Sequence, residues 1–182
     1  MLDLKRFIRE VPDWPKKGVN FKDITPLLKD GAAFGQAIDE MAAPWSGKKI
    51  DLIVGIDARG FILTAALAYK LGVGLAIARK KGKLPWKTIA REYQLEYGSN
   101  IIEMHKDAVE SGQKVLIIDD VLATGGTMAA TCEMVEKLGG EIIGIGFLIG
   151  LSALGGEKKL GAYKIDVLLT FSYKSEHARD RR

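Results

Sequence analysis

The sequence is poor in the residue types that build disulfides and many metal centres. Its 182 residues include one cysteine, Cys132, and two histidines, His105 and His177, which are far apart. A single cysteine cannot form an internal disulfide and agrees with a reducing compartment. The wide spacing also argues against a metal centre of His and Cys ligands. Cys132 lies in a helical pattern, which favours a small buried hydrophobe over a catalytic thiol.

Long apolar runs are also missing. No uninterrupted apolar stretch approaches the roughly 18–20 residues that cross a bilayer. Residues 1–10 contain Asp3, Lys5, Arg6 and Arg9, so they lack the apolar segment of a signal peptide. The composition, 47% hydrophobic and 27% charged, is that of an ordinary globular protein. We therefore expect a cytoplasmic protein of one domain with no membrane partner.

Positive charge is concentrated in one segment. The net charge is +4, and residues 79–91 contain six basic residues and no acidic one. Gly82 and Pro85 in this segment predict a mobile loop rather than a basic helix. From charge alone, the segment is a solvated loop, a nucleic-acid surface or a site for a small polyanion such as pyrophosphate.

Apolar periodicity alternates between two types along the chain. Spacings of three and four predict helices over residues 1–11, 34–43, 61–71 and 127–138. Buried or alternating runs predict strands over residues 51–56, 73–78, 92–97, 100–105, 115–118, 142–149 and 165–171. Residues 92–105 are typical of a hairpin that turns at Gly98 and Ser99. This order favours an α/β fold with a mostly parallel twisted sheet and helices on both faces.

Residues 115–127 carry the most information about chemistry. Four apolar residues precede Asp119 and Asp120, and in an open α/β sheet ligands bind beyond the carboxyl ends of strands. The loop that follows can offer backbone N–H groups and hydroxyls to a phosphate at a helix start. It consists of Ala123, Thr124, Gly125, Gly126 and Thr127. It matches neither the Walker A loop nor the dinucleotide fingerprint.

The two adjacent carboxylates constrain what the loop binds. Asp119 and Asp120 would repel a phosphate if both faced it. They are explained if they accept hydrogen bonds from a sugar diol or act through a cation. The residues thus indicate phosphate and ribose with magnesium nearby. The alternative is a helix-capping turn with two surface acids.

This segment resembles the phosphoribosyl pyrophosphate signature of the type I phosphoribosyltransferases, and residues 122–127 resemble the adenine-specific branch. Three other stretches match that branch in the expected order: residues 12–28, 55–61 and 80–98. The resemblance covers about residues 12–160. It implies the type I phosphoribosyltransferase fold with a small hood, near residues 12–28 and 150–160, and a flexible lid hairpin near residues 79–98.

The resemblance also implies a reaction. Relatives join adenine to phosphoribosyl pyrophosphate and release AMP and pyrophosphate, with Mg²⁺ held mainly by substrate and water and not directly by the protein. They act in purine salvage as homodimers. Two rivals are the same chemistry on another purine, and a regulator that senses phosphoribosyl pyrophosphate while binding DNA. Because the matched segments use nearly the whole chain, we expect no nucleic-acid partner.

Roles for single residues follow from the same resemblance. Asp119 and Asp120 match the ribose site, and residues 123–127 match the 5′-phosphate site. The pyrophosphate loop, which often contains a cis non-proline peptide in relatives, matches Asp57, Ala58, Arg59 and Gly60. The catalytic candidates are Arg59, Lys83 and Glu96, of which Glu96 would move a proton at the purine. The adenine candidates are Asn20, Phe21, Lys22 and Leu151, with Phe21 stacked on the ring.

Two residues depart from the pattern of that branch. Lys22 stands where arginine is common, and Gly150 replaces a common acidic residue beside Leu151. Lysine at position 22 is tolerable if the base contacts the backbone N–H of this residue. Glycine at position 150 bears on the fine shape of the base pocket. Trp86 is a bulky residue for the expected lid, and the resemblance does not explain it.

Overall fold

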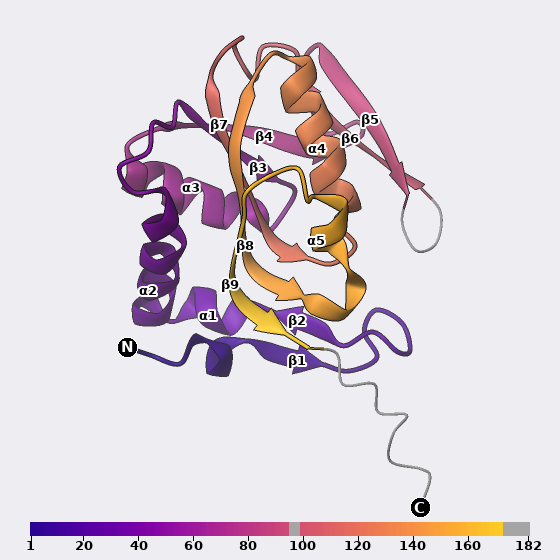
Figure 1. Cartoon of the computed structure of the whole chain (residues 1–182). Coiled ribbons are helices and arrows are strands. Elements are labelled where there is room, and N and C mark those ends of the chain that lie inside the picture. The colour runs from indigo at the N-terminus through magenta and orange to yellow at the C-terminus, as the bar shows by residue number, and fades with distance from the viewer. Residues whose placement is uncertain (95–98, 173–182) are drawn as a thin grey trace, which may run out of the picture.

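The computed structural model describes residues 1–94 and 99–172, which form an α/β fold (Figure 1). In this part of the chain a seven-stranded sheet has the order β5-β6-β4-β3-β7-β8-β9. The parallel strands are β3 (Leu52–Ile56), β4 (Gly74–Lys80), β7 (Lys114–Leu122), β8 (Glu141–Leu151) and β9 (Ile165–Phe171). The hairpin of β5 (Thr88–Gln94) and β6 (Ser99–His105) continues the sheet in antiparallel fashion beside β4. The predicted fold class is confirmed.

Helices cover both faces of this sheet, as Figure 1 shows. On one face lie α2 (Gly31–Ala42) and α3 (Gly60–Leu71), which bury one apolar cluster with β3, β7 and β8. On the other lies α4 (Gly126–Lys137), which buries a second cluster with β6 and β7. The short elements are η1 (Leu4–Phe7), α1 (Thr25–Lys29), η2 (Ala43–Trp45), η3 (Ser152–Leu154) and α5 (Gly156–Lys159).

Close packing at a glycine places α3 on the sheet. A Cβ atom at Gly55 of β3 would lie 2.5 Å from Oγ1 of Thr64, so only glycine admits the helix at this depth. The Thr64 hydroxyl donates to the Gly60 carbonyl at 2.8 Å. Gly72 ends the helix in a left-handed conformation. The start of α3 is therefore fixed at the end of β3, where the loop of residues 57–60 begins.

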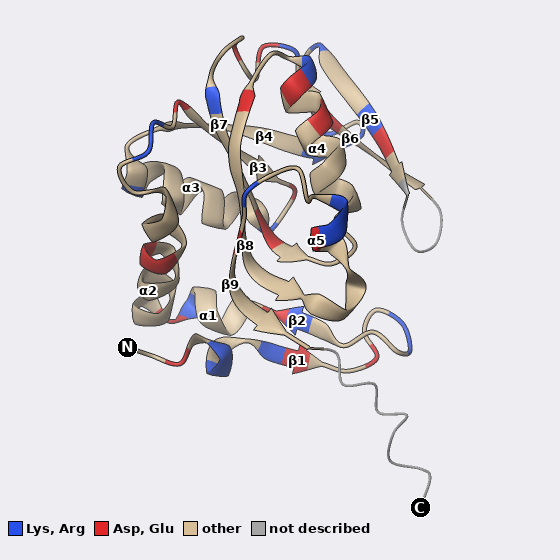
Figure 2. Ribbon diagram, viewed as in Figure 1, with Lys and Arg blue, Asp and Glu red and all other residues tan. Residues whose placement is uncertain are grey.

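The amino-terminal segment differs from the prediction. The helix predicted over residues 1–11 is wrong, because only η1 is helical and β1 (Arg9–Val11) follows it. β1 pairs antiparallel with β2 (Phe21–Asp23). This small sheet lies near the carboxyl ends of β8 and β9, and Figure 2 shows charges of both signs along it. Residues 9–11 form a strand because they pair with β2, which begins ten residues further along the chain. The spacing of apolar residues within residues 1–11 does not reveal this pairing.

Several predicted boundaries also changed. β7 continues four residues beyond Ile118, so Asp119 and Asp120 lie inside the strand rather than at its end. β4 reaches Lys80 and β5 begins at Thr88, which shortens the predicted basic loop to residues 81–87. Ser99 belongs to β6, whereas residues 95–98, including Glu96, lie outside the described residues.

No helix in the described part of the chain is long and apolar enough to cross a bilayer.

Candidate active site

A cleft of about 470 Å³ opens where the parallel strands end. The loop of residues 57–60, the hairpin β5–β6, the end of β7 and the small sheet β1–β2 contribute to its walls. Its lining residues are Trp14, Phe21, Ile56, Asp57, Ala58, Arg59, Lys80, Tyr93, Asn100, Ile102, Asp119, Asp120 and Thr127. The cleft therefore brings together residues that are up to 113 positions apart, from Trp14 to Thr127.

The register of β7 explains why its carboxylates face this cleft. β3 pairs with β7 only as far as Gly55 and Ile118, whereas β8 pairs with β7 as far as Leu122. Asp119 and Asp120 thus lie beyond the last residue of β7 that pairs with β3. At this point the edge of β7 that faced β3 has no neighbouring strand among the described residues. The strand runs to Leu122 because β8 supplies hydrogen-bond partners that the local sequence does not reveal. Ligands of open α/β sheets bind at such a place.

The loop of residues 57–60 packs directly against these carboxylates. Its Asp57–Ala58 peptide bond is cis, as the resemblance led us to expect. A Cβ atom at Gly60 would lie 2.8 Å from Oδ1 of Asp119, so a larger residue would push the carboxylate away. The four predicted residues of this loop and the aspartate pair therefore share one site.

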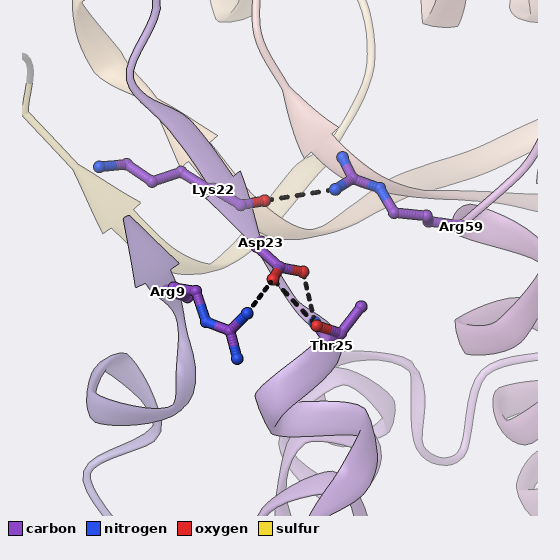
Figure 3. A network of polar contacts seen from close by, with 5 residues as sticks. All are labelled: Arg9, Lys22, Asp23, Thr25 and Arg59. Carbon is purple, nitrogen blue, oxygen red and sulfur yellow. Dashed lines mark hydrogen bonds and ion pairs between the residues drawn. The ribbon is translucent and has the colours of Figure 1, made fainter. Parts of the chain in front are cut away.

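Arg59 connects three parts of the cleft. Its Nη2 lies 2.6 Å from Oδ2 of Asp120 in an ion pair, although Oδ2 has no aligned hydrogen bond. Its Nη1 donates to the Lys22 carbonyl at 3.3 Å, the contact drawn in Figure 3. The guanidinium carbon also lies 4.7 Å from the centre of the Phe21 ring, a distance suited to a cation–π contact. One side chain thus spans the small sheet, the loop and β7.

The aspartate pair is strained electrostatically. Burial raises the pKa of Asp119 well above its ordinary value, and the neighbouring Asp120 carboxylate raises it further. Part of the Asp119 side chain still faces solvent, but protein atoms enclose its carboxylate on the side of Gly60. Burial also raises the pKa of Asp120, and the Arg59 guanidinium opposes that rise. A cation or a hydrogen-bond donor entering the cleft would relieve this cost.

The predicted phosphate loop encloses a separate small pocket of about 60 Å³. Gly125 adopts a left-handed conformation with φ of 76°, and α4 begins at the next residue. Its backbone N–H groups therefore lie at the start of a twelve-residue helix, an arrangement suited to an anion. All five residues, Ala123, Thr124, Gly125, Gly126 and Thr127, line this pocket together with Asp119.

A contact that sequence reasoning missed supports this loop from outside. A Cβ atom at Gly156, the first residue of α5, would lie 2.4 Å from the Ala123 carbonyl oxygen and 3.0 Å from the Gly125 nitrogen. The start of α5 therefore touches the backbone of the predicted phosphate loop. Gly156 is 31 residues beyond Gly125, and no local signal marks it.

The predicted base-binding residues divide into two groups. Phe21 lines the cleft and packs edge-on against Trp14, with ring centres 4.4 Å apart. Asn20 and Lys22 direct their side chains to Glu10 instead, at 2.6 Å and 2.9 Å. Figure 3 shows the Lys22 side chain running away from Arg59 while its carbonyl points toward it. Leu151 is partly buried against the core and is not among the described residues that line the cleft.

The charge network around β2 keeps this strand in place. Asp23 forms an ion pair with Arg9 at 3.4 Å and accepts from the backbone and hydroxyl of Thr25, both at 2.9 Å (Figure 3). The Thr25 hydrogen bonds hold the pKa of Asp23 below its usual value. The Lys22 and Asn20 hydrogen bonds do the same for the pKa of Glu10. The strand that carries Phe21 is thus held by side chains outside the cleft.

Other lining residues were not assigned from sequence. Tyr93 and Asn100 form a cross-strand pair in the hairpin and line the cleft together. The strict alternation of residues 92–97 could have placed Tyr93 on the buried face. Trp14 lies in the matched stretch of residues 12–28 but was given no role, and no motif marks Asn100. Arg79 donates to Asp57 at 3.1 Å and to the Lys83 carbonyl at 3.2 Å, so it joins the basic loop to the cleft. Sequence identified Arg79 only as one member of a basic run.

The oxygen atoms that the cleft offers suit a metal ion held mainly by the bound substrate. Within the described residues, no three His, Cys, Asp or Glu side chains gather as a metal cage. The cleft nevertheless presents two adjacent carboxylates, Asp119 and Asp120. Mg²⁺ commonly keeps several waters and binds through one or two carboxylates plus substrate phosphates. The residues present therefore fit Mg²⁺ held with substrate oxygens and water.

Comparison with known proteins agrees with this geometry. The family model described as "Phosphoribosyl transferase domain" matches residues 27–177. The adenine phosphoribosyltransferase of Geobacter metallireducens is 57% identical over 94% of this chain and 100% of its own length. The chain belongs to the adenine phosphoribosyltransferase family. Family members are phosphoribosyl-transferring enzymes, and the matched segments cover nearly all of the described elements.

Solved structures show the same relationship in three dimensions. The adenine phosphoribosyltransferase of Thermoanaerobacter pseudethanolicus has a TM-score of 0.91 and 53% identity, covering 93% of this chain and 98% of its own. The Saccharomyces cerevisiae enzyme, complexed with D-2,5-dideoxy-2,5-imino-altritol 1,6-bisphosphate and adenine, has a TM-score of 0.86 and 37% identity. It covers 92% of this chain and 97% of its own. The fold is therefore that of type I phosphoribosyltransferases.

The contact at Gly156 predicts a defect in phosphate binding. In Gly156→Ala, the new methyl group meets backbone atoms that cannot rotate away, so the phosphate loop must shift. We expect the affinity for ribose 5-phosphate, measured by calorimetry, to fall about tenfold, the effect of roughly 1–3 kcal/mol of overpacking. Gly161→Ala is the matched control, because its nearest contact would be an ordinary 3.6 Å. Equal affinities in the two variants would contradict the supporting role of Gly156.

The buried carboxylates predict an unusual dependence of stability on pH. The pKa of Asp119 is raised in the folded state, so between its ordinary and raised values the folded chain binds more protons than the unfolded chain. Stability attributable to Asp119 therefore falls as pH rises through this window. Asp119→Asn keeps an acceptor oxygen without the charge. We expect its melting temperature to exceed the wild-type value at pH 7 and the difference to shrink toward pH 4. A lower melting temperature at pH 7 would contradict the assignment.

Proposed function

We propose that this chain joins adenine to 5-phospho-α-D-ribose 1-diphosphate and releases AMP and pyrophosphate, as an enzyme of purine salvage. The observation that carries the proposal is the convergence of three segments on the cleft and the small pocket beside it, which share Asp119 and Thr127: residues 57–60, the aspartate pair and residues 123–127. Together they offer sites for a pyrophosphate, a ribose and a phosphate. The high identity to adenine phosphoribosyltransferases supports adenine as the base.

The donor substrate would extend across the two pockets. We assign its 5′-phosphate to the N–H groups of residues 123–127, at the start of α4. Its ribose hydroxyls donate to Asp119 and Asp120. Asp119 lines both the cleft and the small pocket, and Asp120 lines the cleft. Its pyrophosphate meets residues 57–60, with Arg59 and Lys83 supplying positive charge. This order matches the linear order of groups in phosphoribosyl pyrophosphate.

The base would lie on the side of the small sheet. Phe21 offers an aromatic face for stacking, and backbone groups of Asn20 and Lys22 read the purine edge. The Lys22 side chain is bound by Glu10, which supports backbone reading and explains why lysine can replace arginine here. The resemblance also assigns Leu151, at the end of β8, to the far side of the base, although this side chain packs against the core and does not line the cleft. Nothing in the structure explains the glycine at position 150 in terms of base choice.

Catalysis in this proposal needs no protein nucleophile. A purine nitrogen displaces pyrophosphate at the anomeric carbon while positive charge develops on the sugar ring. The cleft lowers the activation barrier by positioning both substrates. Arg59 and Lys83 lower it further by neutralising the charge of the departing pyrophosphate. Glu96 accepts or relays the purine proton. Mg²⁺, held mainly by substrate and water beside Asp119 and Asp120, would supply further neutralisation of negative charge.

The basic loop and the hairpin form the lid in this proposal. Residues 79–98 fold over the pyrophosphate, exclude water and bring cations to the leaving group. Residues 12–28 and 150–160 form the hood that covers the base. Lys80 lines the cleft and Arg79 binds Asp57 at its wall, which agrees better with a small polyanion than with DNA, and we propose no nucleic-acid or membrane partner.

We also propose a cytoplasmic homodimer. Ile62 and Tyr69 on α3 and Leu75 on β4 are large exposed hydrophobic residues on neighbouring elements. Such a patch is typical of an interaction surface. Light scattering at micromolar concentration should give the mass of two chains, and a monomer would contradict this part of the proposal.

The direct test is an assay of AMP formation from adenine, phosphoribosyl pyrophosphate and Mg²⁺, with hypoxanthine, guanine and xanthine as controls. Product from adenine alone would support the reaction and the base together. Product from another purine would retain the ribose and phosphate assignments and remove adenine. Binding of phosphoribosyl pyrophosphate without turnover of any base would favour a sensor, which a salt-dependent gel shift with DNA would then test.

The aspartate pair predicts a specific loss of affinity. In Asp119→Asn/Asp120→Asn, the amides keep the shape of the carboxylates but accept weaker hydrogen bonds from the ribose hydroxyls. We expect the dissociation constant of phosphoribosyl pyrophosphate to rise at least about tenfold, as for loss of hydrogen bonds to charged groups. Calorimetry measures it, and circular dichroism should show an unchanged fold. Unaltered affinity would remove the ribose assignment.

The role proposed for Glu96 predicts that its substitution lowers turnover. Glu96→Gln removes the proton acceptor and keeps the size, so kcat should fall by about 10²–10⁴, the usual range for general acid–base catalysis. Initial rates at saturating substrates measure this effect. The control is Glu92→Gln, an exposed carboxylate of the same hairpin that binds the Ser99 hydroxyl. If kcat is unchanged in Glu96→Gln, this residue has no part in proton transfer.

A further inference from the structure

Glu103 is a buried carboxylate that the proposed reaction does not use. It lies in β6, the middle strand of the β5-β6-β4 part of the sheet, with 8% of its surface exposed. Its cross-strand neighbour in β4 is Arg79, whereas the next pair is Lys80 with Ile102. Side chains alternate along strands, so Glu103 lies on the face opposite to Ile102 and Lys80, which line the cleft. Glu103 therefore stands behind the cleft wall.

The contact that Glu103 makes is with the basic loop. Its Oε2 accepts the Gly82 N–H at 3.0 Å. Gly82 has φ of 79°, and the Lys83 N–H donates to the Lys80 carbonyl at 3.3 Å, which closes a tight turn over residues 80–83. The Lys81 N–H also donates to Ile101 at 3.0 Å. A carboxylate from the sheet thus accepts the N–H at the apex of this turn.

Arg79 holds the same turn from its other side. Its guanidinium donates to the Lys83 carbonyl at 3.2 Å and to the Asp57 carboxylate at 3.1 Å. The turn is therefore tied to Glu103 at Gly82 and, through Arg79, to the loop that carries Arg59. Residues 79–91 contain no acidic residue, so the carboxylate that binds this turn comes from another strand. These bonds fix the backbone of Lys83 next to the pyrophosphate loop.

We propose that Glu103 is a positioning residue that fixes the turn of residues 80–83 and so sets the position of Lys83 for the pyrophosphate. The inference rests on the proposed function of Lys83. It divides the basic loop into an anchored root, residues 80–83, which Glu103 and Arg79 hold, and a following part, residues 84–87, which they do not contact. Glu103 contacts no substrate and acts only through the loop.

Two substitutions at this position separate its roles. Glu103→Ala removes the acceptor, and Glu103→Gln retains an acceptor oxygen. We expect Glu103→Ala to raise the KM for phosphoribosyl pyrophosphate about tenfold, the effect of losing a hydrogen bond to a charged acceptor. Glu103→Gln should recover most of this loss, and the KM for adenine should stay within about twofold in both variants.

The matched control is Asp51→Ala. Asp51 is another partly buried carboxylate that accepts a backbone N–H, from Lys114 at 2.8 Å, but it lies at the opposite end of the strands. Its loss should lower the melting temperature without changing the KM for phosphoribosyl pyrophosphate. Equal increases in both KM values for Glu103→Ala, or the same increase in Asp51→Ala, would show a general structural role and overturn the proposal.

A double-mutant cycle with Lys83→Ala tests the route of the effect. If Glu103 acts through Lys83, adding Lys83→Ala to Glu103→Ala should change the KM by less than about twofold, because the two losses overlap. Fully additive effects would overturn the proposal.

Tryptic cleavage of the ligand-free protein gives a readout that does not need activity. Release of the root should speed cleavage after Lys81 and Lys83 at least about tenfold in Glu103→Ala, relative to wild type and to Asp51→Ala. An unchanged cleavage rate would show that Glu103 does not anchor the turn. If the wild type makes no AMP but cleavage accelerates, the proposed function fails while the anchor stands.

Discussion

The ion pair between Arg59 and Asp120 is the contact on which the arrangement of the cleft depends. Two adjacent carboxylates on β7 are costly to bury, and the guanidinium offsets part of that cost. The same side chain donates to Lys22 and covers Phe21, so it links the small sheet to the parallel sheet. Under the proposed function, Arg59, Asp120 and Phe21 all bind substrate groups. These mutual contacts must therefore be exchanged for ligand contacts when the cleft fills.

Close backbone approach makes this arrangement possible. Gly60 allows the loop after β3 to touch Asp119, and Gly156 allows α5 to touch the backbone at Ala123 and Gly125. Each contact joins segments that are far apart in the sequence, and a methyl group at either glycine would separate them. The proposed anion sites are thus built largely from backbone, which explains why their shape depends on residues to which we assign no ligand. Glu103 acts in the same way on the basic loop, by binding a backbone N–H.

Local patterns predicted much of the fold and the parts of the site that lie within single segments. The limits of β9 and the glycine-rich start of α4 follow from apolar runs and turn residues, and the cis bond at Asp57 follows from the resemblance. Long-range pairing decided what the sequence could not predict. β1 exists because β2 pairs with it, and β7 extends past Ile118 because β8 does. The direction of the Lys22 side chain depends on Glu10, twelve residues away. Glu96 lies outside the described residues, so its role remains a prediction.

The most direct test is a crystal structure of this chain with AMP and pyrophosphate. We expect the 5′-phosphate at the N–H groups of residues 123–127, the ribose hydroxyls on Asp119 and Asp120, and the adenine ring on Phe21. We also expect Arg59 to leave Asp120 and contact the pyrophosphate. AMP bound elsewhere, or bound in this cleft with its base and phosphate reversed, would contradict the proposed arrangement of substrates.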